Sequence, residues 1–397
     1  MSLTDKVGGR SLAIFYDMAY PFTDGGGQRR LYEVGRRLVS GGWTVHWFAL
    51  KTWEGDSIRE QNGIVYFGLQ GHTKVYGSNG KRSLREALSY GKAVLFEKTD
   101  FSKYDLVWCG QWPIFHILAL VIRLVPWRTR LLVDWWEVWG RYWFEYAGMI
   151  GLGGWILEVV LSKSVTRMGY AVVDSKTGWN RFLSLGAQEN KIALIPNGVN
   201  FNELTQGEPE KGQTDIAYFG RLKGHKNIDH LIRALAILKE RDNRRLTADI
   251  IGDGPERSSL EDLAHSLGIA DQIVFQGRVE TEQAKALLKR AQVFVHPSTQ
   301  ECGGSVNLLE ANACGLPVVC YHHPMGIDPS QVKSGETGLM LAPVNPFALA
   351  DGILEMLDLV KNRDIREQCI AHARSFDWNV IAERYRVFLE DIIFPKL

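Results

Sequence analysis

The regular alternation of short apolar runs with longer helical patterns constrains the fold of this chain more than any other feature. Such alternation is typical of βαβ units and parallel sheets, so the predicted fold class is α/β. In the first half we expect strands at 11–16, 44–50, 105–109, 130–134 and 171–173, and helices at 27–41, 83–96, 112–125 and 175–185. In the second half we expect strands at 216–220, 248–252, 272–277, 292–296 and 317–321, and a last helix at 378–392.

A polar stretch with two glycines, "LTQGEPEKGQTD" at 204–215, separates the two halves and predicts a linker. A chain of 397 residues is also too long for one ordinary domain. We therefore expect an N-terminal domain over 1–204 and a C-terminal domain over 205–377, with the last helix (378–397) crossing back to the first domain. Two Rossmann-like domains would face each other across a cleft, since open α/β sheets bind ligands beyond the carboxyl ends of their strands.

Composition excludes several classes of protein. With 45% hydrophobic residues and a formal net charge of +1, the chain is globular and has no electrostatic case for binding nucleic acid. The five cysteines form no CxxC pair, which argues against a zinc site or a disulfide framework. His322 and His323 with Asp328 resemble metal ligands, but adjacent histidines in a strand point to opposite faces, so no metal is expected.

Two observations bear on localisation. The N-terminus, MSLTDKVGGR, has no apolar signal core. The most lipid-like run, at 114–125, is too short to span a bilayer and contains Arg123. We expect a cytoplasmic protein, either soluble or associated with the inner face of the membrane.

Glycine loops follow several of the predicted strands. Gly25 and Gly26 let the backbone approach a bound group at the entrance to a helix, although an ordinary tight turn explains them nearly as well. The segment 250–268, which contains Gly252, repeats the order of strand, glycine loop and helix. The segment 273–291 repeats it again, with Arg278 and Val279 just past the strand.

"YFGRLKGHKNIDHLIRAL" (218–235) places two cations, Arg221 and Lys226, between a strand and a helix. At the carboxyl edge of a sheet such a pair could clamp a diphosphate and stabilise negative charge as it leaves. A solvated basic loop is the alternative interpretation.

"PSTQECGGSVNLLEANACGLPVV" (297–319) predicts a loop that turns into a helix, with one acid on each side of the turn. Gly303 and Gly304 permit unusual backbone angles, and Ser305 is a good N-cap. A helix N-terminus is an anion site, whereas Glu301 and Glu310 would repel an anion unless they bind hydroxyl groups attached to it. A sugar nucleotide carries both a diphosphate and hydroxyls.

These motifs together resemble the donor-binding domain of the family 4 retaining glycosyltransferases, which have the GT-B fold. The patterns "GRL…K…LI…A", "IGDGP…L…A…LG", "V.F.GRV" and "E…EA.ACG.PVV" match the family in type, order and spacing over roughly 215–340. "IPNGVN" (195–200) and the Gly25-Gly26 loop extend the resemblance into the first half.

The resemblance implies a role for each matching position. Arg221 and Lys226 would bind the diphosphate of the donor, and Glu310 would hold the ribose hydroxyls. The backbone near Arg278 and Val279 would meet the base. Glycines of the strand-to-helix loops complete the expected nucleotide-sugar contacts: Gly25, Gly26 and Gly252.

The resemblance also implies how the sugar is held. Glu301 and the backbone of Gly303, Gly304 and Ser305 would contact the donor sugar and its distal phosphate. Arg221, Lys226 and Glu301 are the residues expected to act in catalysis. The family is generally metal-independent, and the leaving phosphate is thought to help deprotonate the acceptor during front-face attack.

The sequence departs from the family pattern at two places. Eight residues, not seven, lie between Glu301 and Glu310, and we assign the extra residue to the loop because Glu301 keeps the usual distance from Pro297. Cys302 in place of the first acid is the alternative.

The second departure is in "LLVDWWEVWGRYWFEY" (131–146), where many family members have a His followed by an acid that contacts the donor sugar. Trp136 and Glu137 stand there in this chain, which leaves Asp134 and Glu137 as polar candidates on the acceptor or sugar side.

Many tryptophans crowd this part of the first half. They would form a bulky core, a sugar-stacking platform or a surface at the membrane interface, where indoles and nearby arginines sit well. The tryptophans are Trp108, Trp112, Trp127, Trp135, Trp136, Trp139, Trp143 and Trp155, and the arginines are Arg123, Arg128, Arg130 and Arg141.

The sequence thus predicts a retaining, metal-independent glycosyltransferase with no cofactor. It would move a sugar from a UDP- or GDP-linked donor to a hydroxyl acceptor, plausibly a polyprenyl-type lipid-linked or cell-envelope glycan. A sugar-nucleotide epimerase or a phosphorylase shares the fold, but the motif set argues against both. A catalytically silent subunit that binds a sugar nucleotide, or a scaffold for a partner transferase, is the non-enzymatic alternative.

Overall fold

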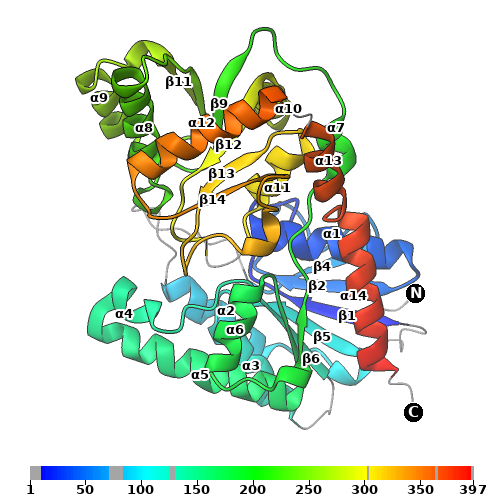
Figure 1. Ribbon diagram of the computed structural model, residues 1–397. Helices are drawn as coiled ribbons and strands as arrows, with labels where there is room; N and C mark the ends of the chain where they lie inside the picture. The colour runs from blue at the N-terminus through cyan, green and yellow to red at the C-terminus, as the bar shows by residue number, and fades with distance from the viewer. Residues whose placement is uncertain (1–9, 71–83, 126–129, 302–303, 363–364, 395–397) are drawn as a thin grey trace. The chain divides into compact units, whose positions relative to one another are not determined.

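The computed structural model describes residues 10–70, 84–125, 130–301, 304–362 and 365–394 (Figure 1). The chain forms two compact units. Unit 1 comprises Met1–Pro196 together with Asn379–Leu397, and unit 2 comprises Asn197–Trp378. Each unit is built on one sheet of mostly or entirely parallel strands. The predicted α/β class is therefore confirmed.

Unit 1 contains an eight-stranded sheet in the order β3-β4-β2-β1-β5-β6-β7-β8. The strands are β1 (Ser11–Phe15), β2 (Thr44–Ala49), β3 (Ile58–Gln61), β4 (Ile64–Gly68), β5 (Leu106–Gly110), β6 (Arg130–Trp135), β7 (Tyr170–Val173) and β8 (Ile192–Leu194). All neighbours are parallel except β3, which pairs antiparallel with β4. The central strands β1 and β5 are buried along their whole length. Apart from Ser11, both faces of each strand therefore carry apolar residues or glycine.

The β3–β4 hairpin was not predicted, although its signal is present in the sequence. Asn62 and Gly63 form the turn with φ angles of 53° and 75°. Positive φ at both central positions belongs to the two-residue hairpin turn that matches the twist of the strands, and Asn-Gly is its preferred sequence.

Helices connect the strands of unit 1. They are α1 (Gly26–Ser40), α2 (Leu84–Phe96), α3 (Phe115–Leu124), α4 (Tyr142–Ala147), α5 (Gly151–Met168) and α6 (Lys176–Ser184), with the short turns η1 (Phe101–Lys103), η2 (Gly148–Ile150) and η3 (Glu189–Lys191). Helix α2 packs on α3, and α3 packs on α5, so these three form a continuous layer.

The C-terminal helix α14 (Trp378–Ile393) returns to unit 1, as predicted. Tyr385 is fully buried there, and its hydroxyl donates to Asp134 Oδ2 at 2.7 Å. Arg30 of α1 donates to the same carboxylate at 3.0 Å, and its other nitrogens reach the carbonyls of Ile195 (2.6 Å) and Pro196 (2.8 Å). Helix α14 therefore closes the core of unit 1 around a buried ion pair.

Unit 2 contains a six-stranded, fully parallel sheet in the order β11-β10-β9-β12-β13-β14. The strands are β9 (Thr214–Phe219), β10 (Ala248–Ile251), β11 (Ile273–Gly277), β12 (Ala291–His296), β13 (Val318–Tyr321) and β14 (Gly338–Leu341). Alternate residues of β9 face opposite cores: Ile216 and Tyr218 pack with α8 and α12, whereas Ala217 packs on the other side.

The helices of unit 2 are α7 (Phe201–Thr205), α8 (Ile228–Arg241), α9 (Arg257–Ser266), α10 (Thr281–Arg290), α11 (Val306–Ala313), α12 (Pro346–Asn362) and α13 (Arg366–Arg374). Three short turns accompany them: η4 (Gly224–Lys226), η5 (Ala270–Gln272) and η6 (Pro329–Gln331).

The boundary between the units lies earlier than the polar stretch at 204–215. Val199 donates its backbone N–H to Phe376 at 2.9 Å and accepts from the N–H of Trp378 at 3.1 Å, which fixes residues after Pro196 to unit 2. The polar stretch is a surface loop of unit 2, held in part by Lys289, whose ammonium donates to the carbonyls of Thr205 and Gly207. The polar composition of 204–215 therefore reflects an exposed loop and does not mark the linker between the units.

Strand order identifies one switch point in each sheet. In unit 1 the connections diverge from between β1 and β5, and in unit 2 from between β9 and β12. Loops that leave neighbouring parallel strands in opposite directions open a crevice at their carboxyl ends, where ligands bind in this class of sheet.

Candidate functional site

The switch point of unit 2 brings the two most informative loops together. The loop after β9 contains Arg221 and Lys226, and the loop after β12 contains Glu301. These are the three residues predicted to act in catalysis, and their loops follow neighbouring strands of one sheet.

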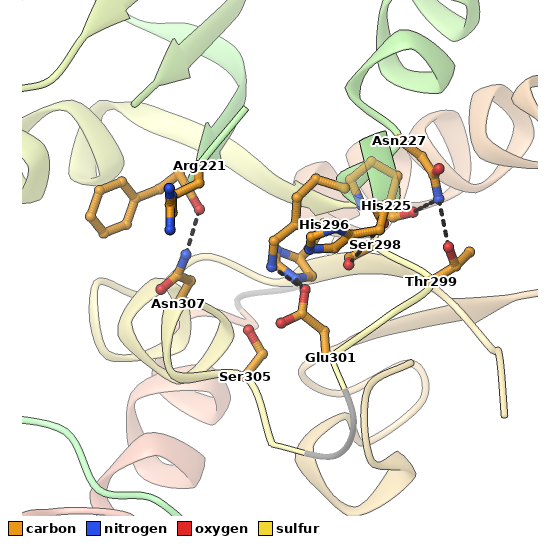
Figure 2. Close-up of polar contacts among 12 residues, drawn as sticks. Arg221, His225, Asn227, His296, Ser298, Thr299, Glu301, Ser305 and Asn307 are labelled. Carbon is orange, nitrogen blue, oxygen red and sulfur yellow. Dashed lines mark hydrogen bonds and ion pairs between the residues drawn. The ribbon is translucent and has the colours of Figure 1, made fainter. Parts of the chain in front are cut away.

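Asn227 ties the two loops to each other. Its φ of 49° lies in the left-handed region, which Asn tolerates better than most residues. Its side-chain amide donates to the carbonyl of Pro297 at 2.9 Å and to Thr299 Oγ1 at 3.1 Å (Figure 2). The carbonyl of His225 accepts from the backbone N–H of Thr299 at 3.1 Å. The neighbouring Lys226 is thereby held against the β12 loop.

Glu301 lies between two basic side chains. Its Oε1 accepts from Lys226 Nζ and from His296 Nε2, the latter at 2.9 Å (Figure 2). His296, the last residue of β12, is completely buried and stacks with Tyr218 and Phe294. Among the residues that the structure describes, Glu301 Oε2 has no hydrogen-bond partner, and the side chain is 11% exposed. One carboxylate oxygen is fixed, and the other is left for a ligand.

The charge of Glu301 is set by its neighbours. Burial by itself would raise the pKa of this carboxyl group, but His296 and Lys226 outweigh burial and hold the pKa well below its usual range. The pKa of His225, half-buried in the same loop, is lowered by burial and then by Lys226. Glu301 is therefore an ionised acceptor in any ordinary buffer, and it cannot serve as a general acid.

Arg221 lies directly after Gly220 and is exposed. No ion-pair partner for its guanidinium occurs within the described part of the chain. Its backbone is held in place, since its carbonyl accepts from the buried Tyr218 hydroxyl at 3.1 Å. An exposed guanidinium without an ion-pair partner among the described residues, on the same loop as Lys226, fits the predicted role of a diphosphate ligand.

The N-terminus of α11 differs from the prediction in one respect. Ser305 precedes the helix, but its backbone N–H donates to Gln331 Oε1 at 2.8 Å and its side chain makes no capping bond. Gly304 stands next to it, while Gly303 and Cys302 lie outside the described residues. The Ser305 amide is thus used inside the protein rather than offered to a phosphate.

Glu310 lies in the second turn of α11 and is half-buried. Helix α11 is tied to the site by Asn307, whose amide donates to the carbonyl of Phe219 at the end of β9 at 2.7 Å (Figure 2). The helix that carries Glu310 is therefore fixed to the strand that leads to Arg221.

Gly252 serves backbone packing at the edge of the sheet. Its φ is +129°, and a Cβ there would lie 1.9 Å from the carbonyl oxygen of Gly220. Its N–H donates to the carbonyl of Gly277 at 2.8 Å. Gly252 allows the loops after β9, β10 and β11 to meet, and its amide is not free for a ligand. Arg278 follows Gly277 on this edge and is exposed, and Val279 is half-buried.

The corresponding edge of unit 1 contains the glycine loop. Helix α1 begins at Gly26, no side chain caps it, and a Cβ at Gly26 would meet no atom within 4 Å. At Gly27, in contrast, a Cβ would lie 2.4 Å from the indole of Trp136, which also contacts Tyr16 edge to face at 5.5 Å. Trp136 thus forms the wall of this loop.

Glu137 and Asp134 have different environments. Glu137 is half-buried, and its carboxylate accepts from the Trp139 indole at 3.0 Å. Gln111 holds the Glu137 backbone with two hydrogen bonds. Its Nε2 donates to the Glu137 carbonyl at 2.5 Å, and its Oε1 accepts from the Glu137 N–H at 2.9 Å. Asp134 is completely buried in the ion pair with Arg30, and this burial argues against the prediction that it meets an acceptor.

The described tryptophans of this region are buried or half-buried. Trp108 and Trp135 are completely buried, and Trp112, Trp139 and Trp143 stack on one another with centroid separations of 4.6–6.1 Å. None of the cluster's described tryptophans is exposed, and Trp127 lies outside the described residues. The core interpretation thus holds for Trp108 and Trp135, and the half-buried tryptophans stay candidates for stacking on a sugar.

A buried carboxylate organises the same region. Glu158 of α5 accepts from the backbone N–H groups of Trp139 (3.0 Å) and Gly140 (2.7 Å) and from the Trp143 indole (3.2 Å). Burial raises its pKa, and these hydrogen bonds oppose that rise. Glu158 has a structural role, because it accepts the hydrogen bonds of backbone N–H groups in the loop between β6 and α4.

Four residues of the unit 2 site were missed from the sequence. His296 precedes the "PST" segment and was passed over as part of a strand, and Gln331 lies 26 positions away from its partner Ser305. Asn227 and Asn307 look like ordinary polar residues at the start of helices. Only Asn227, next to a lysine at a helix N-terminus, carried a local signal.

No group of three or more potential metal ligands occurs within the described ranges. Asp328 caps η6 through the N–H of Ser330 at 2.8 Å, and His323 Nδ1 accepts from the N–H of Met325 at 3.1 Å. Both side chains thus have local structural partners.

Two protein-family models match the chain. Residues 200–376 match the model described as glycosyl transferases group 1, and residues 25–198 match the model described as glycosyl transferase 4-like domain. An uncharacterized glycosyltransferase of Methanocaldococcus jannaschii is 33% identical over 224 residues, which are 51% of this chain and 55% of that protein. The chain thus spans about half the length of the curated relatives it matches.

Two solved structures share the fold over nearly the whole chain. Sucrose-phosphate synthase from Thermosynechococcus elongatus has a TM-score of 0.77 at 20% identity, covering 98% of this chain and 100% of that one. HepE of Anabaena, solved in complex with UDP, has a TM-score of 0.73 at 18% identity, covering 96% and 100%. Both comparisons show the predicted GT-B fold.

Proposed function

The chain belongs to the group 1, family 4-type glycosyltransferases, and on that premise we propose that it transfers a sugar from a nucleoside-diphosphate sugar to a hydroxyl acceptor. We propose that the reaction retains the anomeric configuration and needs no metal ion. The acceptor in this proposal is a lipid-linked or cell-envelope glycan.

The observation that carries the proposal is the arrangement at the unit 2 switch point. The ammonium of Lys226 pairs with the Glu301 carboxylate, whose second oxygen has no hydrogen-bond partner among the described residues. An exposed guanidinium, that of Arg221, is carried by the same loop as Lys226. Lys226 has three N–H donors and uses one for Glu301, so two remain for a phosphate. This combination suits a ligand that carries a diphosphate and hydroxyl groups together.

Each group has a role in the proposed step. The acceptor oxygen forms a bond to the anomeric carbon while the bond from that carbon to the phosphate oxygen breaks. The acceptor proton passes to an oxygen of the leaving phosphate. Arg221 and Lys226 stabilise the charge that develops on the diphosphate, and Glu301 Oε2 accepts a hydroxyl of the donor sugar. The UDP complex of HepE supports a nucleotide donor.

The test is transfer of labelled sugar from a panel of UDP-, GDP- and ADP-sugars into a lipid extract of the source cell, with and without a chelator. We expect label from one donor to enter the organic phase and to resist the chelator. Lys226→Ala should lower kcat/KM about 10²- to 10³-fold, because it removes one donor from developing charge. Lys211→Ala, an exposed lysine elsewhere in unit 2, is the matched control and should have no effect.

Other outcomes decide between the alternatives. Label transferred but retained in the aqueous phase would move the acceptor to a soluble glycan. Donor binding without turnover for any acceptor would favour the silent subunit. Loss of activity with the chelator, restored by a divalent cation, would contradict the metal-independent mechanism.

A further inference from the structure

Three adjacent helices of unit 1 expose an unusual set of side chains. Helices α2, α3 and α5 form one layer (cyan to green in Figure 1). Across the described residues of these helices, every exposed residue is apolar, glycine or basic, and none is acidic or neutral polar. The basic ones are Arg85 and Lys92 on α2 and Lys163 and Arg167 on α5.

The exposed residues of α5 form a single stripe. Leu152, Ile156 and Val160 recur at intervals of four, which places them on one helix face. Lys163 and Arg167 continue the same stripe toward the C-terminus of the helix. The face is therefore apolar at its first half and basic at its end.

The turn that precedes α5 is more exposed still. Met149 and Ile150 in η2 are 81% and 87% exposed, the highest values among the large hydrophobic residues described. Leu118 and Ile122 on the neighbouring α3 and Leu88 and Phe96 on α2 extend the apolar surface sideways. Large exposed apolar patches of this kind mark an interaction site.

The outer helix of unit 2 provides a contrast within the same molecule. Helix α12 also exposes one large apolar residue, Phe347, at 62%. Its other exposed residues are Asp351, Glu355, Asp358 and Lys361, so acids predominate. Helix α12 thus shows that an outer helix of this chain can carry exposed acids, whereas the described residues of α2, α3 and α5 expose none.

We propose that the outer face of α2, α3 and α5, with the η2 turn, docks on a membrane surface that contains anionic lipids. Met149 and Ile150 enter the boundary between headgroups and acyl chains, and the basic residues contact the lipid phosphates. The inference rests on the proposed function in one respect, since such docking would bring the transferase to a lipid-linked acceptor.

Charge decides between a lipid surface and a second copy of the chain. A twofold interface would place this face against itself and bring basic residues together without acids to pair them. An anionic surface pairs all of them. The combination of apolar and basic residues therefore favours lipid over self-association.

The protein would lie on the membrane rather than cross it. The segment Gly148–Met168 is the one helix, in the part of the chain described, that is long and apolar enough to span a bilayer, with a mean hydropathy of 1.3. However, α5 packs on β6 and β7 of the sheet, and its inner face carries the buried Glu158. Spanning would strip these contacts away.

The test is flotation of the purified full chain with vesicles of phosphatidylcholine, with and without phosphatidylglycerol, in the absence of any donor. We expect binding that requires phosphatidylglycerol and weakens with salt. Met149→Ser with Ile150→Ser should abolish flotation, whereas the control Phe347→Ser should not. Lys163→Glu with Arg167→Glu should reduce binding at least about tenfold, and the exposed pair Arg244→Glu with Arg245→Glu in unit 2 should leave it unchanged.

Several results would overturn the inference. They are flotation that is equal in all variants, flotation that is indifferent to phosphatidylglycerol, and no flotation of the parent protein. A dimer in sedimentation that Met149→Ser with Ile150→Ser dissolves, without vesicle binding, would assign the face to a second copy. Circular dichroism confirms that each variant is folded. Because binding is measured without donor, its failure is distinct from a failure of sugar transfer.

Discussion

At the scale of single residues, the environment of Glu301 explains more than its position in a motif does. One oxygen is shared by Lys226 and by a buried histidine, His296, so the carboxylate has one fixed and one available oxygen. His296 is completely buried and bonds to Glu301. It acts through Glu301, as a positioning residue.

Replacing His296 by Phe tests this role. Phe keeps the stacking with Tyr218 and Phe294 but removes the N–H donor, so burial is opposed by Lys226 alone and the pKa of Glu301 rises. Glu301 then takes up a proton at a higher pH, and the acid limb of the kcat/KM profile moves to higher pH with a raised KM for the donor. His296→Gln, which retains a side-chain N–H, should restore most of the parent profile. An unchanged acid limb in His296→Phe would contradict the positioning role.

The ionised Glu301, paired with Lys226 and His296, also contributes to the free energy of unfolding in a pH-dependent way. Because the folded-state pKa of Glu301 lies below its ordinary value of 4.5, the ion pair stabilises the fold above that value. The contribution is lost as the pH falls through the lowered pKa.

At the scale of secondary structure, the regular βαβ elements could be predicted, and the irregular ones could not. Short, mostly apolar runs such as 11–15 and 292–296 can be recognised from composition alone, because a strand that is buried on both faces has few polar residues. Helix α5 was missed because it begins with Gly151, Gly153 and Gly154, which disfavour a helix locally. Its packing on the sheet and the hydrogen bonds of Glu158 override that preference.

The two loops of the candidate site show the same limit. Arg221 and Lys226 lie in one short motif and Glu301 lies in another, so each could be recognised within its own local pattern. The Ser305–Gln331 bond and the burial of Asp134 against Arg30 and Tyr385 join residues far apart in sequence, so no local pattern announces them.

Glu158→Ala tests the anchoring of α5. The substitution leaves the N–H groups of Trp139, Gly140 and the Trp143 indole without their acceptor, and we expect a loss of at least about 2 kcal/mol in the free energy of unfolding near neutral pH. Urea titration followed by tryptophan fluorescence measures it. The exposed Glu145→Ala on α4 is the control and should change stability little.

Glu158 also makes the free energy of unfolding depend on pH, in the direction opposite to Glu301. Since burial raises the folded-state pKa of Glu158 above 4.5, the folded state holds its proton more tightly, and stability falls as the pH rises from 4.5 through the raised pKa. This slope should be smaller in Glu158→Ala. An equal slope in both proteins would show that other groups produce it.

At the scale of the whole molecule, the chain leaves unit 1 at Pro196 and returns to it at Asn379. The returning segment contains Tyr385, whose hydroxyl donates to Asp134 and accepts from Arg30 in the core of unit 1. Removing that hydroxyl leaves a buried ion pair short of one partner.

Tyr385→Phe should therefore destabilise unit 1 by about 1–3 kcal/mol and leave unit 2 unchanged. Differential scanning calorimetry should resolve the unfolding of the two units and show a shift in one of them. Arg384→Ala, the exposed neighbour on the same helix, is the matched control. A shift of both transitions by equal amounts would mean that the units unfold as one.

The return of α14 also has a consequence for synthesis on the ribosome. Most of unit 1 precedes unit 2 in the chain, yet Arg30 and Asp134 cannot bind Tyr385 until α14 has been synthesised. At translation rates of about 5–20 residues per second, roughly 10–40 seconds separate the synthesis of Pro196, where the first segment of unit 1 ends, from that of Tyr385. Unit 2 ends at Trp378, so we expect it to complete its fold before unit 1 does. Until α14 is synthesised, Arg30 and Asp134 lack the hydroxyl of Tyr385 in the core of unit 1.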